Sequence, residues 1–302
     1  MSRVHEARSD GRYAPSPTGD LHLGNLRTAV LAWLFARSAG ARFLVRLEDL
    51  DAGRVRPGHA ERQLADLAAI GLEWDGEVVV QSARQDAYLE ALERLRAAGR
   101  IYECFCTRAE IREAASAPHG PLPEGAYPGT CARLTEDERS ERIAAGRLPA
   151  LRLRAGGERI AFADGVLGPQ SGAVDDFVVR RNDGAVAYNL AVVVDDAAQG
   201  IGEVVRGADL VDSTPRQILL AGLLGAEPPR FAHVPLVLGP DGARLAKRHG
   251  AVTLRDVDPA RALAWMARSL DLPEAASPRE WVEGFDPARI PREPTVLDPA
   301  FV

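Results

Sequence analysis

The sequence contains very little lysine and very little cysteine. Lys247 is the single lysine among 37 cationic residues in a chain of 302, so all the others are arginine. The three cysteines are an odd number, and all of them lie between residues 104 and 131. A disulfide framework needs paired cysteines and an oxidising compartment, so this clustering indicates a metal site instead.

Long apolar runs are also absent. No stretch approaches the length of about 20 residues that a membrane span needs, and residues 1–10 lack the apolar core of a signal peptide. We therefore expect a cytoplasmic protein without a membrane partner. The net charge of −6 argues against a broadly basic nucleic-acid coat, although a local arginine face would be enough to bind RNA.

Strand-like and helix-like runs alternate over the first 100 residues, which is typical of a parallel α/β sheet. A stretch rich in proline and glycine, 116–130, breaks this alternation and marks an insertion. The predicted elements are a strand at 42–48, a helix at 57–70 with Pro57 in its first turn, a helix at 82–98 with Ser82 and Gln85 as a capping box, a helix from Thr135, strands over 149–164, strand-like runs over 174–196, a helix opening at Thr214, and a short helix near 260–270.

A glycine-containing loop joins the first strand to the first helix. The stretch Arg12-Tyr-Ala-Pro-Ser-Pro-Thr-Gly-Asp-Leu-His-Leu-Gly-Asn25 runs into an apolar helix that opens at Leu26. Free backbone N–H groups and the positive end of the helix dipole point into such a loop, which suits a phosphate group. His22 can donate to phosphate oxygens, and glycine lets a flat base come close to the backbone.

This stretch resembles the first nucleotide-binding motif of class I aminoacyl-tRNA synthetases, in its glutamyl form. That family carries a second motif, usually Lys-Met-Ser-Lys-Ser, and Arg244-Leu-Ala-Lys-Arg248 stands in its place, with Arg244 for the first Lys and Ala246 for the Ser. A lone lysine in an arginine-rich chain indicates that a compact, mobile ammonium is needed. The resemblance implies that His22 and Lys247 are catalytic and that ATP, with Mg²⁺, is bound by Pro15, His22, Gly24, Asn25 and Lys247.

Charged residues at strand ends predict an amino-acid pocket. Arg12 ends the first predicted strand and Glu48 the second, and ligands collect at the carboxyl ends of parallel strands. A carboxylate meets a substrate ammonium, and arginine meets a substrate carboxylate in bidentate fashion. The resemblance implies that glutamate is bound by Arg12, Ser16, Glu48, Tyr188 and Arg206.

The cysteine spacing predicts a zinc site. Cys104-x-Cys106 and Cys131 supply three of the four ligands that a structural zinc needs. On chemistry alone His119 is the better fourth ligand. The layout also resembles the Cys-x-Cys…Tyr-x-x-x-Cys site of glutamyl-Q tRNA(Asp) synthetases, which implies Tyr127 as that ligand. The alternative is three unrelated buried cysteines without a metal.

The segment from Tyr188 to Asp196 separates two branches of the family. Ordinary glutamyl-tRNA synthetases carry His and Asn where this chain has Asn189 and Val192, so the resemblance favours the glutamyl-Q branch. It implies an ATP-dependent ligase that forms glutamyl-adenylate and transfers glutamate to queuosine in the anticodon of tRNA(Asp). The alternatives are a short conventional synthetase that charges a tRNA 3′ end, and a non-catalytic nucleotide- or RNA-binding regulator with a synthetase core.

Together the motifs predict an α/β fold, a Rossmann-like parallel-sheet catalytic domain with a zinc-bearing insertion and a short helical stem-contact region. After the second motif the chain is expected to be too short for a helical anticodon-binding domain. The predicted segments are 11–100, the first Rossmann-like half; 101–148, the zinc-bearing insertion; 149–225, the second Rossmann-like half; and 226–302, the stem-contact-like region with the second motif and a proline-rich tail.

Overall fold

A seven-stranded sheet forms the centre of the molecule, in the order β3-β2-β1-β9-β10-β6-β7. The computed structural model describes residues 10–107, 109–111, 126–243, 245, 252–298 and 301. All neighbours from β3 to β6 are parallel, and β7 is antiparallel to β6. The strands of this sheet are β1 (Asp10–Tyr13), β2 (Phe43–Leu47), β3 (Val79–Val80), β6 (Arg159–Asp164), β7 (Gly168–Ala173), β9 (Ile201–Gly207) and β10 (Arg230–Val234).

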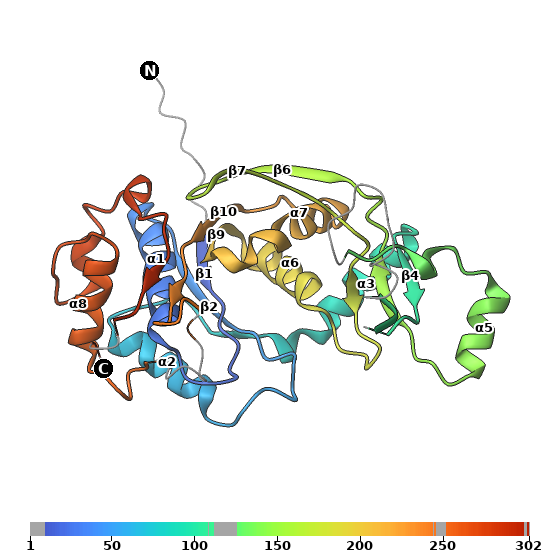
Figure 1. Cartoon of the computed structure of the whole chain (residues 1–302), viewed down its shortest axis with the longest axis horizontal. Helices are drawn as coiled ribbons and strands as arrows, with labels where there is room; N and C mark the ends of the chain where they lie inside the picture. Colours follow the sequence, from blue (N-terminus) through green and yellow to red (C-terminus); the bar gives the residue numbers. More distant parts are fainter. Residues whose placement is uncertain are drawn as a thin grey trace, which may run out of the picture.

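Helices cover both faces of this sheet, as an α/β fold requires (Figure 1). Phe43 and Val45 of β2 share a core cluster with α1 on one face, whereas Leu44 belongs to a cluster with residues of β9 and β10 on the other. The helices are α1 (Leu23–Ser38), α2 (His59–Ala69), α3 (Gln85–Ala97), α5 (Glu136–Ala144), α6 (Tyr188–Gln199), α7 (Thr214–Leu223) and α8 (Pro259–Ser269), with the 3-10 helices η1 (Gln81–Arg84), η2 (Thr130–Arg133), η3 (Ala208–Ser213), η5 (Pro278–Trp281) and η6 (Pro287–Arg289).

Helix α1 begins at Leu23 rather than at the predicted Leu26, because His22 caps it. The Nδ1 atom of His22 accepts a hydrogen bond from the Asn25 N–H at 3.3 Å, and the Asn25 side chain accepts one from the His22 N–H at 3.3 Å. This reciprocal pair is a capping box that satisfies two N–H groups at the helix start. Most of α1 is apolar and buried because it lies between the sheet and the C-terminal region.

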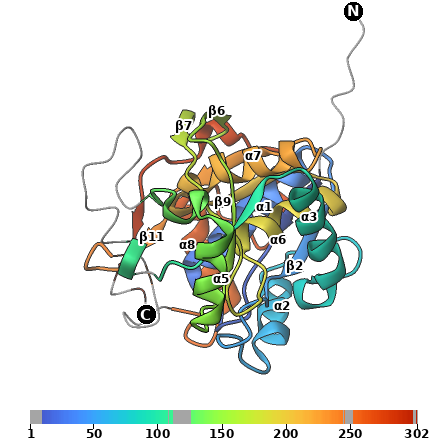
Figure 2. The same cartoon turned by 90° about the vertical axis from the view of Figure 1, so that its right-hand side faces the viewer.

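A second sheet, with the order β4-β5-β8, is antiparallel and connects the central sheet to α5. Its strands are β4 (Ile101–Cys104), β5 (Ala150–Leu153) and β8 (Val178–Arg180). This sheet contains one strand from the predicted segment 101–148 and two strands from the segment 149–225. The division of the chain at these boundaries remains a prediction. Helix α5 buries none of its residues and stands away from the central sheet (Figure 1), at the end of the molecule that faces the viewer in Figure 2.

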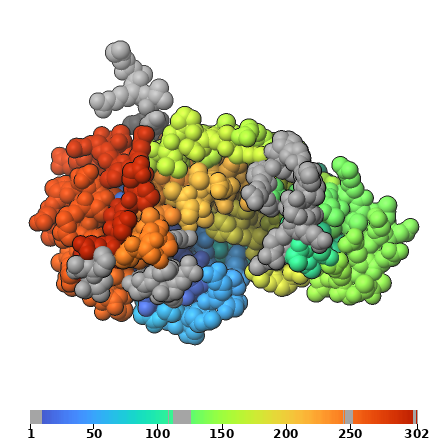
Figure 3. Space-filling model, in the orientation of Figure 1, coloured from blue at the N-terminus to red at the C-terminus, as the bar shows by residue number. Residues whose placement is uncertain are grey.

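The C-terminal region packs against α1. Residues of α8 share the hydrophobic core of α1, and the Arg27 side chain of α1 donates to the Ser269 carbonyl at 3.2 Å. Strand β11 (Val237–Leu238) pairs in parallel with β12 (Thr295–Val296). This region and α5 lie at opposite ends of the molecule (Figure 3). Among the described residues, no helix combines the length and the apolarity that a membrane crossing needs.

The prediction of strand-like structure up to Asp196 is wrong over its second half, where Tyr188–Gln199 forms α6. Three successive valines favour a strand by local preference, but packing against β9 overrides that preference. Gly200 ends the helix in a left-handed conformation with φ of 69°. The helix brings Tyr188, Val192 and Asp196 to one face, since residues four apart are neighbours on a helix.

Two predicted helix starts are also wrong. Pro57 lies before α2, whose N-cap is Gly58 with φ of 76°. Ser82 lies in η1, where its N–H donates to Asp49 at 2.7 Å, so it does not cap α3. The remaining predicted elements are confirmed, namely β2, α5 with its Thr135–Glu138 capping box, the strands β5 and β6, α7 and α8. Most of the loop predicted at 116–130 lies outside the described residues.

The close approach of α1 to β1 gives a first prediction. A Cβ at Gly11 would lie 3.0 Å from the Ala36 Cβ, so Gly11→Ala should lower the free energy of unfolding by about 1 kcal/mol or more. Gly222→Ala is the control, because a Cβ there meets nothing within 4 Å and helix α7 should gain about 0.5–1 kcal/mol. Urea denaturation measures both, and equal effects would contradict the tight packing.

Candidate active site

The charged residues predicted for the amino-acid pocket gather at the carboxyl edge of the parallel sheet. Arg12 lies near the end of β1, Glu48 directly follows β2, and Arg206 lies near the end of β9. Tyr188 reaches the same place from the first turn of α6, close enough to interact with the Arg206 guanidinium. Because parallel strands end at one edge, four residues far apart in the sequence meet there.

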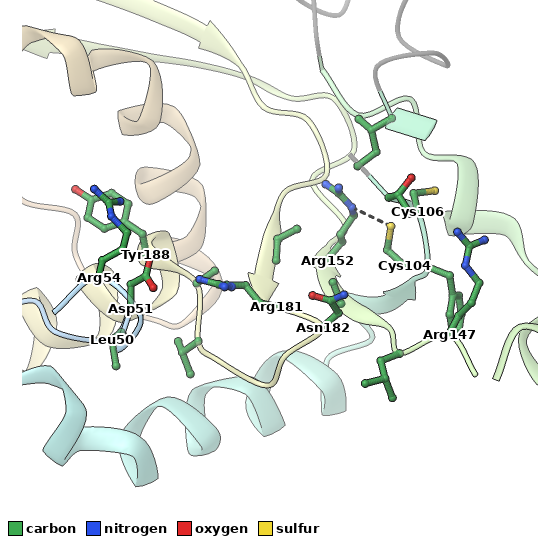
Figure 4. A pocket seen from close by; sticks show the side chains of 18 of the residues that line it. Leu50, Asp51, Arg54, Cys104, Cys106, Arg147, Arg152, Arg181, Asn182 and Tyr188 are labelled. Carbon is green, nitrogen blue, oxygen red and sulfur yellow. Dashed lines mark hydrogen bonds between the residues drawn. The ribbon is translucent and has the colours of Figure 1, made fainter. Parts of the chain in front are cut away.

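A cavity of about 940 Å³ extends from this edge to the second sheet. Ser16, Glu48 and Tyr188 line one end, and Cys104 and Cys106 line the other. Figure 4 shows Tyr188 near one end of the cavity, the two cysteines at the other, and the side chain of Arg181 between them. The cavity is much larger than one amino acid requires, so it has room for a second substrate.

A buried ionic network supports the pocket. Arg46 donates to Asp196 Oδ1 at 2.7 Å and to Glu48 Oε1 at 3.1 Å, and Arg12 Nε donates to Asp196 Oδ1 at 3.3 Å. Burial alone would raise the pKa of Asp196, but the two guanidinium groups hold it below its usual value. For Glu48 the effect of burial is larger than that of the arginines, and the pKa is raised. Asp196 therefore fixes both arginines, and Arg46 fixes Glu48.

The neighbouring Asp195 ties η1 and α3 to α6. Its Oδ2 atom accepts from Gln81 Nε2 at 2.9 Å and from the Tyr88 hydroxyl at 2.8 Å, and its Oδ1 atom accepts from Arg84 Nε at 2.5 Å. The side chain is fully buried. The sequence interpretation gave neither aspartate a catalytic role, and it also missed Arg46. An arginine inside an apolar strand was the signal, because a buried charge requires a partner.

Arg206 has a different environment, because its hydrogen-bond partners are neutral. Its Nε donates to His233 Nε2 at 3.0 Å, Nη1 to Gln217 Oε1 at 2.8 Å and Nη2 to Thr214 Oγ1 at 2.8 Å. Within the described ranges, none of its ion-pairing or hydrogen-bonding partners is a carboxylate. Burial lowers the pKa of this guanidinium. A buried cation of this kind attracts an anion.

The first motif surrounds the start of α1 as expected. Since Nδ1 of His22 accepts a hydrogen bond, the neutral ring carries its proton on Nε2. Gly24 leaves space for the His22 ring, because a Cβ would lie 3.0 Å from His22 Cε1 and 3.2 Å from Val237 Cβ. The Pro15 carbonyl accepts from the Glu48 N–H at 2.9 Å, which ties the loop to β2. Lys247, Arg244, Ala246 and Arg248 of the second motif lie outside the described residues.

Three thiols meet beside the second sheet and could bind a metal ion. The sulfur atoms of Cys104, Cys106 and Cys131 lie within 4.8 Å of one another. Tyr127 Oη lies 3.4 Å from Cys104 Sγ and 3.6 Å from Cys106 Sγ, so it completes a set of four donor atoms. Burial raises the pKa of Cys106 to about 12, which a bound cation would oppose. His119, the alternative fourth ligand, lies outside the described residues.

Arg152 is a member of the cysteine site that the sequence interpretation missed. Its Nε lies 3.2 Å from Cys104 Sγ, and its guanidinium carbon lies 3.7 Å from the centre of the Tyr127 ring. Thiolates and a phenolate around a divalent cation would leave the site negatively charged. The buried Arg152 guanidinium would balance part of that charge, so the donor set and its surroundings suit a metal ion.

Known proteins of one family are similar to this chain. The family model described as tRNA synthetases class I (E and Q), catalytic domain, matches residues 10–264. A glutamyl-Q tRNA(Asp) synthetase of Nocardia farcinica is 62% identical over 292 residues, which cover 95% of this chain and 92% of the relative. Another protein of that name, from Symbiobacterium thermophilum, is 54% identical, with 94% of both chains covered.

Solved structures are similar over nearly the whole chain. A glutamate tRNA ligase from Elizabethkingia meningosepticum, in complex with its amino acid, matches with a TM-score of 0.82 at 28% identity, covering 98% of this chain and 68% of that one. Glutamate-tRNA synthetase from Elizabethkingia anophelis matches with a TM-score of 0.83 at 28% identity, covering 98% and 69%. The α/β fold, with its mostly parallel sheet, is therefore that of these catalytic domains.

The role of Asp195 as an anchor can be tested by its removal. Asp195→Ala removes the hydrogen-bond acceptor of Tyr88, Gln81 and Arg84, so it should lower the free energy of unfolding by about 3–5 kcal/mol. Asp86→Ala is the control, on the helix α3 that Asp195 holds through Tyr88, because this exposed carboxylate contributes less than about 1 kcal/mol. Guanidinium denaturation of both variants measures the free energy of unfolding. Similar losses of stability in the two variants would refute the anchoring role of Asp195.

Proposed function

Because the chain belongs to the class I aminoacyl-tRNA synthetases of the glutamyl and glutaminyl type, we propose that it activates glutamate with ATP and transfers it to queuosine in the anticodon of tRNA(Asp). The observation that carries the proposal is the meeting of Arg12, Glu48, Tyr188 and Arg206 beside the glycine-containing loop. The names of the relatives that align over nine tenths of both chains support the choice of acceptor. ATP and tRNA are substrates found in the cytoplasm, where we place the enzyme.

In this proposal each charged group of glutamate has a partner. The ammonium group lies against Glu48, which Arg46 orients. The two carboxylates lie against Arg12 and Arg206, and the hydroxyl groups of Ser16 and Tyr188 add hydrogen bonds. Pairing both signs of charge at fixed positions rejects amino acids that lack the side-chain carboxylate, since a buried arginine would then remain without an anion.

Adenylate formation needs charge stabilisation more than covalent chemistry from the protein. The α-carboxylate attacks the α-phosphate of ATP, a new acyl–phosphate bond forms, and pyrophosphate leaves. The N–H groups at the start of α1, the His22 Nε2–H and the Lys247 ammonium stabilise the charge on the phosphates. Pro15, Gly24 and Asn25 shape the loop that holds the nucleotide. Mg²⁺ that arrives with ATP supplies further neutralisation on the pyrophosphate.

The acceptor enters the remainder of the cavity. A hydroxyl of the queuosine base attacks the carbonyl of the adenylate, forms an ester and releases AMP. The volume between Tyr188 and the second sheet gives room for a nucleoside next to bound glutamate. In this proposal each of the four predicted segments has a role. Segments 11–100 and 149–225 form the two halves of the nucleotide-binding sheet. The insertion 101–148 borders the cavity, and 226–302 contacts the tRNA stem.

We infer that one structural zinc is bound by Cys104, Cys106, Cys131 and Tyr127. Three sulfurs and one oxygen around a common point are a donor set that suits zinc. When bound, the ion supplies a cross-link between the end of β4 and η2. That cross-link would fix the wall of the cavity formed by Cys104 and Cys106.

Acceptor mapping tests the proposed reaction. Incubation with labelled glutamate, ATP and tRNA(Asp) should label queuosine, and tRNA(Asp) without queuosine should remain unlabelled. The matched control is Lys247→Ala, which should lose roughly 10²–10³-fold in glutamate-dependent pyrophosphate exchange, as expected for one charge-stabilising group. Label at the 3′ terminal adenosine would indicate a short conventional synthetase, and absence of exchange by the wild type would indicate a regulator.

Metal analysis tests the zinc site. Protein purified without chelator should contain one zinc per chain, and Cys131→Ala should lose it because two thiolates with one phenolate bind zinc weakly. Tyr127→Phe should lower the zinc affinity, whereas His119→Ala should leave it unchanged. Elemental analysis and competition with a chelator measure this. Wild-type protein without zinc would refute the site. If His119→Ala lowered the zinc affinity and Tyr127→Phe did not, His119 would be the fourth ligand instead of Tyr127.

A further inference from the structure

We propose that His233 and Asp164 are positioning residues for glutamate, which hold the Arg206 guanidinium in place without neutralising it. The inference rests on the proposed function, because it assigns Arg206 to a carboxylate of the substrate. Neither His233 nor Asp164 was singled out by the sequence motifs. Both are fully buried at the side chain, and they connect β6 to β10 directly behind Arg206.

Strand register places His233 beside Arg206. Strands β9 and β10 are parallel neighbours, and His233 is the register partner of Arg206, so both side chains lie on the same face of the sheet. The His233 Nε2 atom accepts from Arg206 Nε at 3.0 Å. The Phe231 ring stacks on the His233 ring with centres 6.1 Å apart and lies 5.2 Å from the guanidinium carbon. The inner edge of the guanidinium is therefore held by a rigid group.

Asp164 selects the tautomer of the His233 imidazole whose Nε2 atom can accept the hydrogen bond from Arg206. Its Oδ2 atom lies 2.5 Å from His233 Nδ1, and a carboxylate accepts hydrogen bonds, so the ring proton sits on Nδ1 and Nε2 is left as an acceptor. Burial would raise the pKa of Asp164, but hydrogen bonds from His233 and from the N–H groups of Leu167 and Val166 hold it at about 2. The carboxylate is thus ionised throughout the neutral and mildly acidic range.

His233 must be neutral to act as an acceptor. The charged groups that face it are Asp164 from β6, Arg206 from β9 and Arg12 from β1, whereas α7 contributes the neutral hydroxyl of Thr214. Burial and the two arginines lower the pKa of His233 below its ordinary value, and Asp164 only partly opposes them. Protonation would place an N–H against the N–H of Arg206 and add a second buried cation, so Arg206 would lose its support.

Neutral support has a chemical purpose at this site. Arg12 is held by the carboxylate of Asp196, which compensates its charge, whereas Arg206 is oriented by a ring nitrogen, an amide oxygen and a hydroxyl. Gln217, which provides the amide oxygen, is held in turn by Asn189 at 3.1 Å. Neutral acceptors fix the direction of the guanidinium and leave its full charge for the substrate carboxylate.

Three variants separate positioning from general stability. His233→Gln keeps an acceptor, so its KM for glutamate in pyrophosphate exchange should stay within a few-fold of the wild type. His233→Leu removes the acceptor and should raise that KM by about ten- to a hundredfold, with the KM for ATP unchanged. Asp164→Asn offers an N–H to the ring, moves the ring proton to Nε2 and should behave like His233→Leu. Calorimetric titration with glutamate alone should show the same order of affinities.

The pH dependence gives a second readout. A folded-state pKa below the ordinary value means that His233 is neutral above about pH 6.5 and protonates as the pH falls further. Any loss of glutamate affinity that His233 causes should therefore appear only below about pH 6.5, and His233→Gln should show a smaller decline there. The part of the decline that remains in this variant belongs to Glu48 and to the substrate. Urea denaturation shows whether His233→Leu folds. If it does not, the comparison of the pH dependence between the wild type and His233→Gln tests the inference instead.

The outcomes separate the inference from the proposed function. An active wild type with an unchanged glutamate KM in His233→Leu, or with the same pH dependence in His233→Gln, overturns the inference alone. Equal increases in the KM for glutamate and for ATP would also overturn it, because a merely structural role predicts them. A wild type that neither exchanges pyrophosphate in response to glutamate nor binds glutamate overturns the proposed function, and the inference with it.

Discussion

The buried contact of Arg46 and Arg12 with Asp196 is the interaction on which the site depends. It joins β1, β2 and α6 at the point where the two strands end, and one aspartate oxygen accepts from both guanidinium groups. Desolvating three charges is costly, and direct hydrogen bonds between the arginines and the aspartate offset part of that cost. Its position decides where Glu48 points and where Arg12 lies, and therefore the shape of the proposed amino-acid pocket.

Two kinds of support surround the pocket, and they have different consequences. Asp196 compensates the charge of Arg12, while the neutral partners of Arg206 leave its charge available. A substrate carboxylate would therefore neutralise the charge of Arg206 more than that of Arg12, which Asp196 already compensates. The pocket thus combines a rigid, compensated half with a half that reaches electrostatic balance only when an anion is bound, which is a physical basis for selecting an acidic amino acid.

Much of the fold could be predicted from the sequence because local rules and tertiary packing agree there. The apolar strand 42–48, the Thr135 cap and the proline at the start of α7 act locally. The valine-rich α6 was misread because β-branched residues favour strands unless packing overrides them. Of the site residues that the motifs predicted, Ser16, Glu48, Tyr188, Cys104 and Cys106 line the cavity. His233 and Asp164 could not be found in the same way, because their roles depend on strand register, which a single sequence does not reveal.

The central claim is that the carboxyl edge of the sheet binds a glutamyl group between charges of opposite sign. A crystal structure with a non-hydrolysable analogue of glutamyl-adenylate tests it most directly. The account predicts the ammonium group on Glu48, the side-chain carboxylate on an arginine of the pair Arg12 and Arg206, and the phosphate mimic at the start of α1 near His22. An analogue bound elsewhere in the cavity, or bound here with its side-chain carboxylate away from both arginines, would contradict the account.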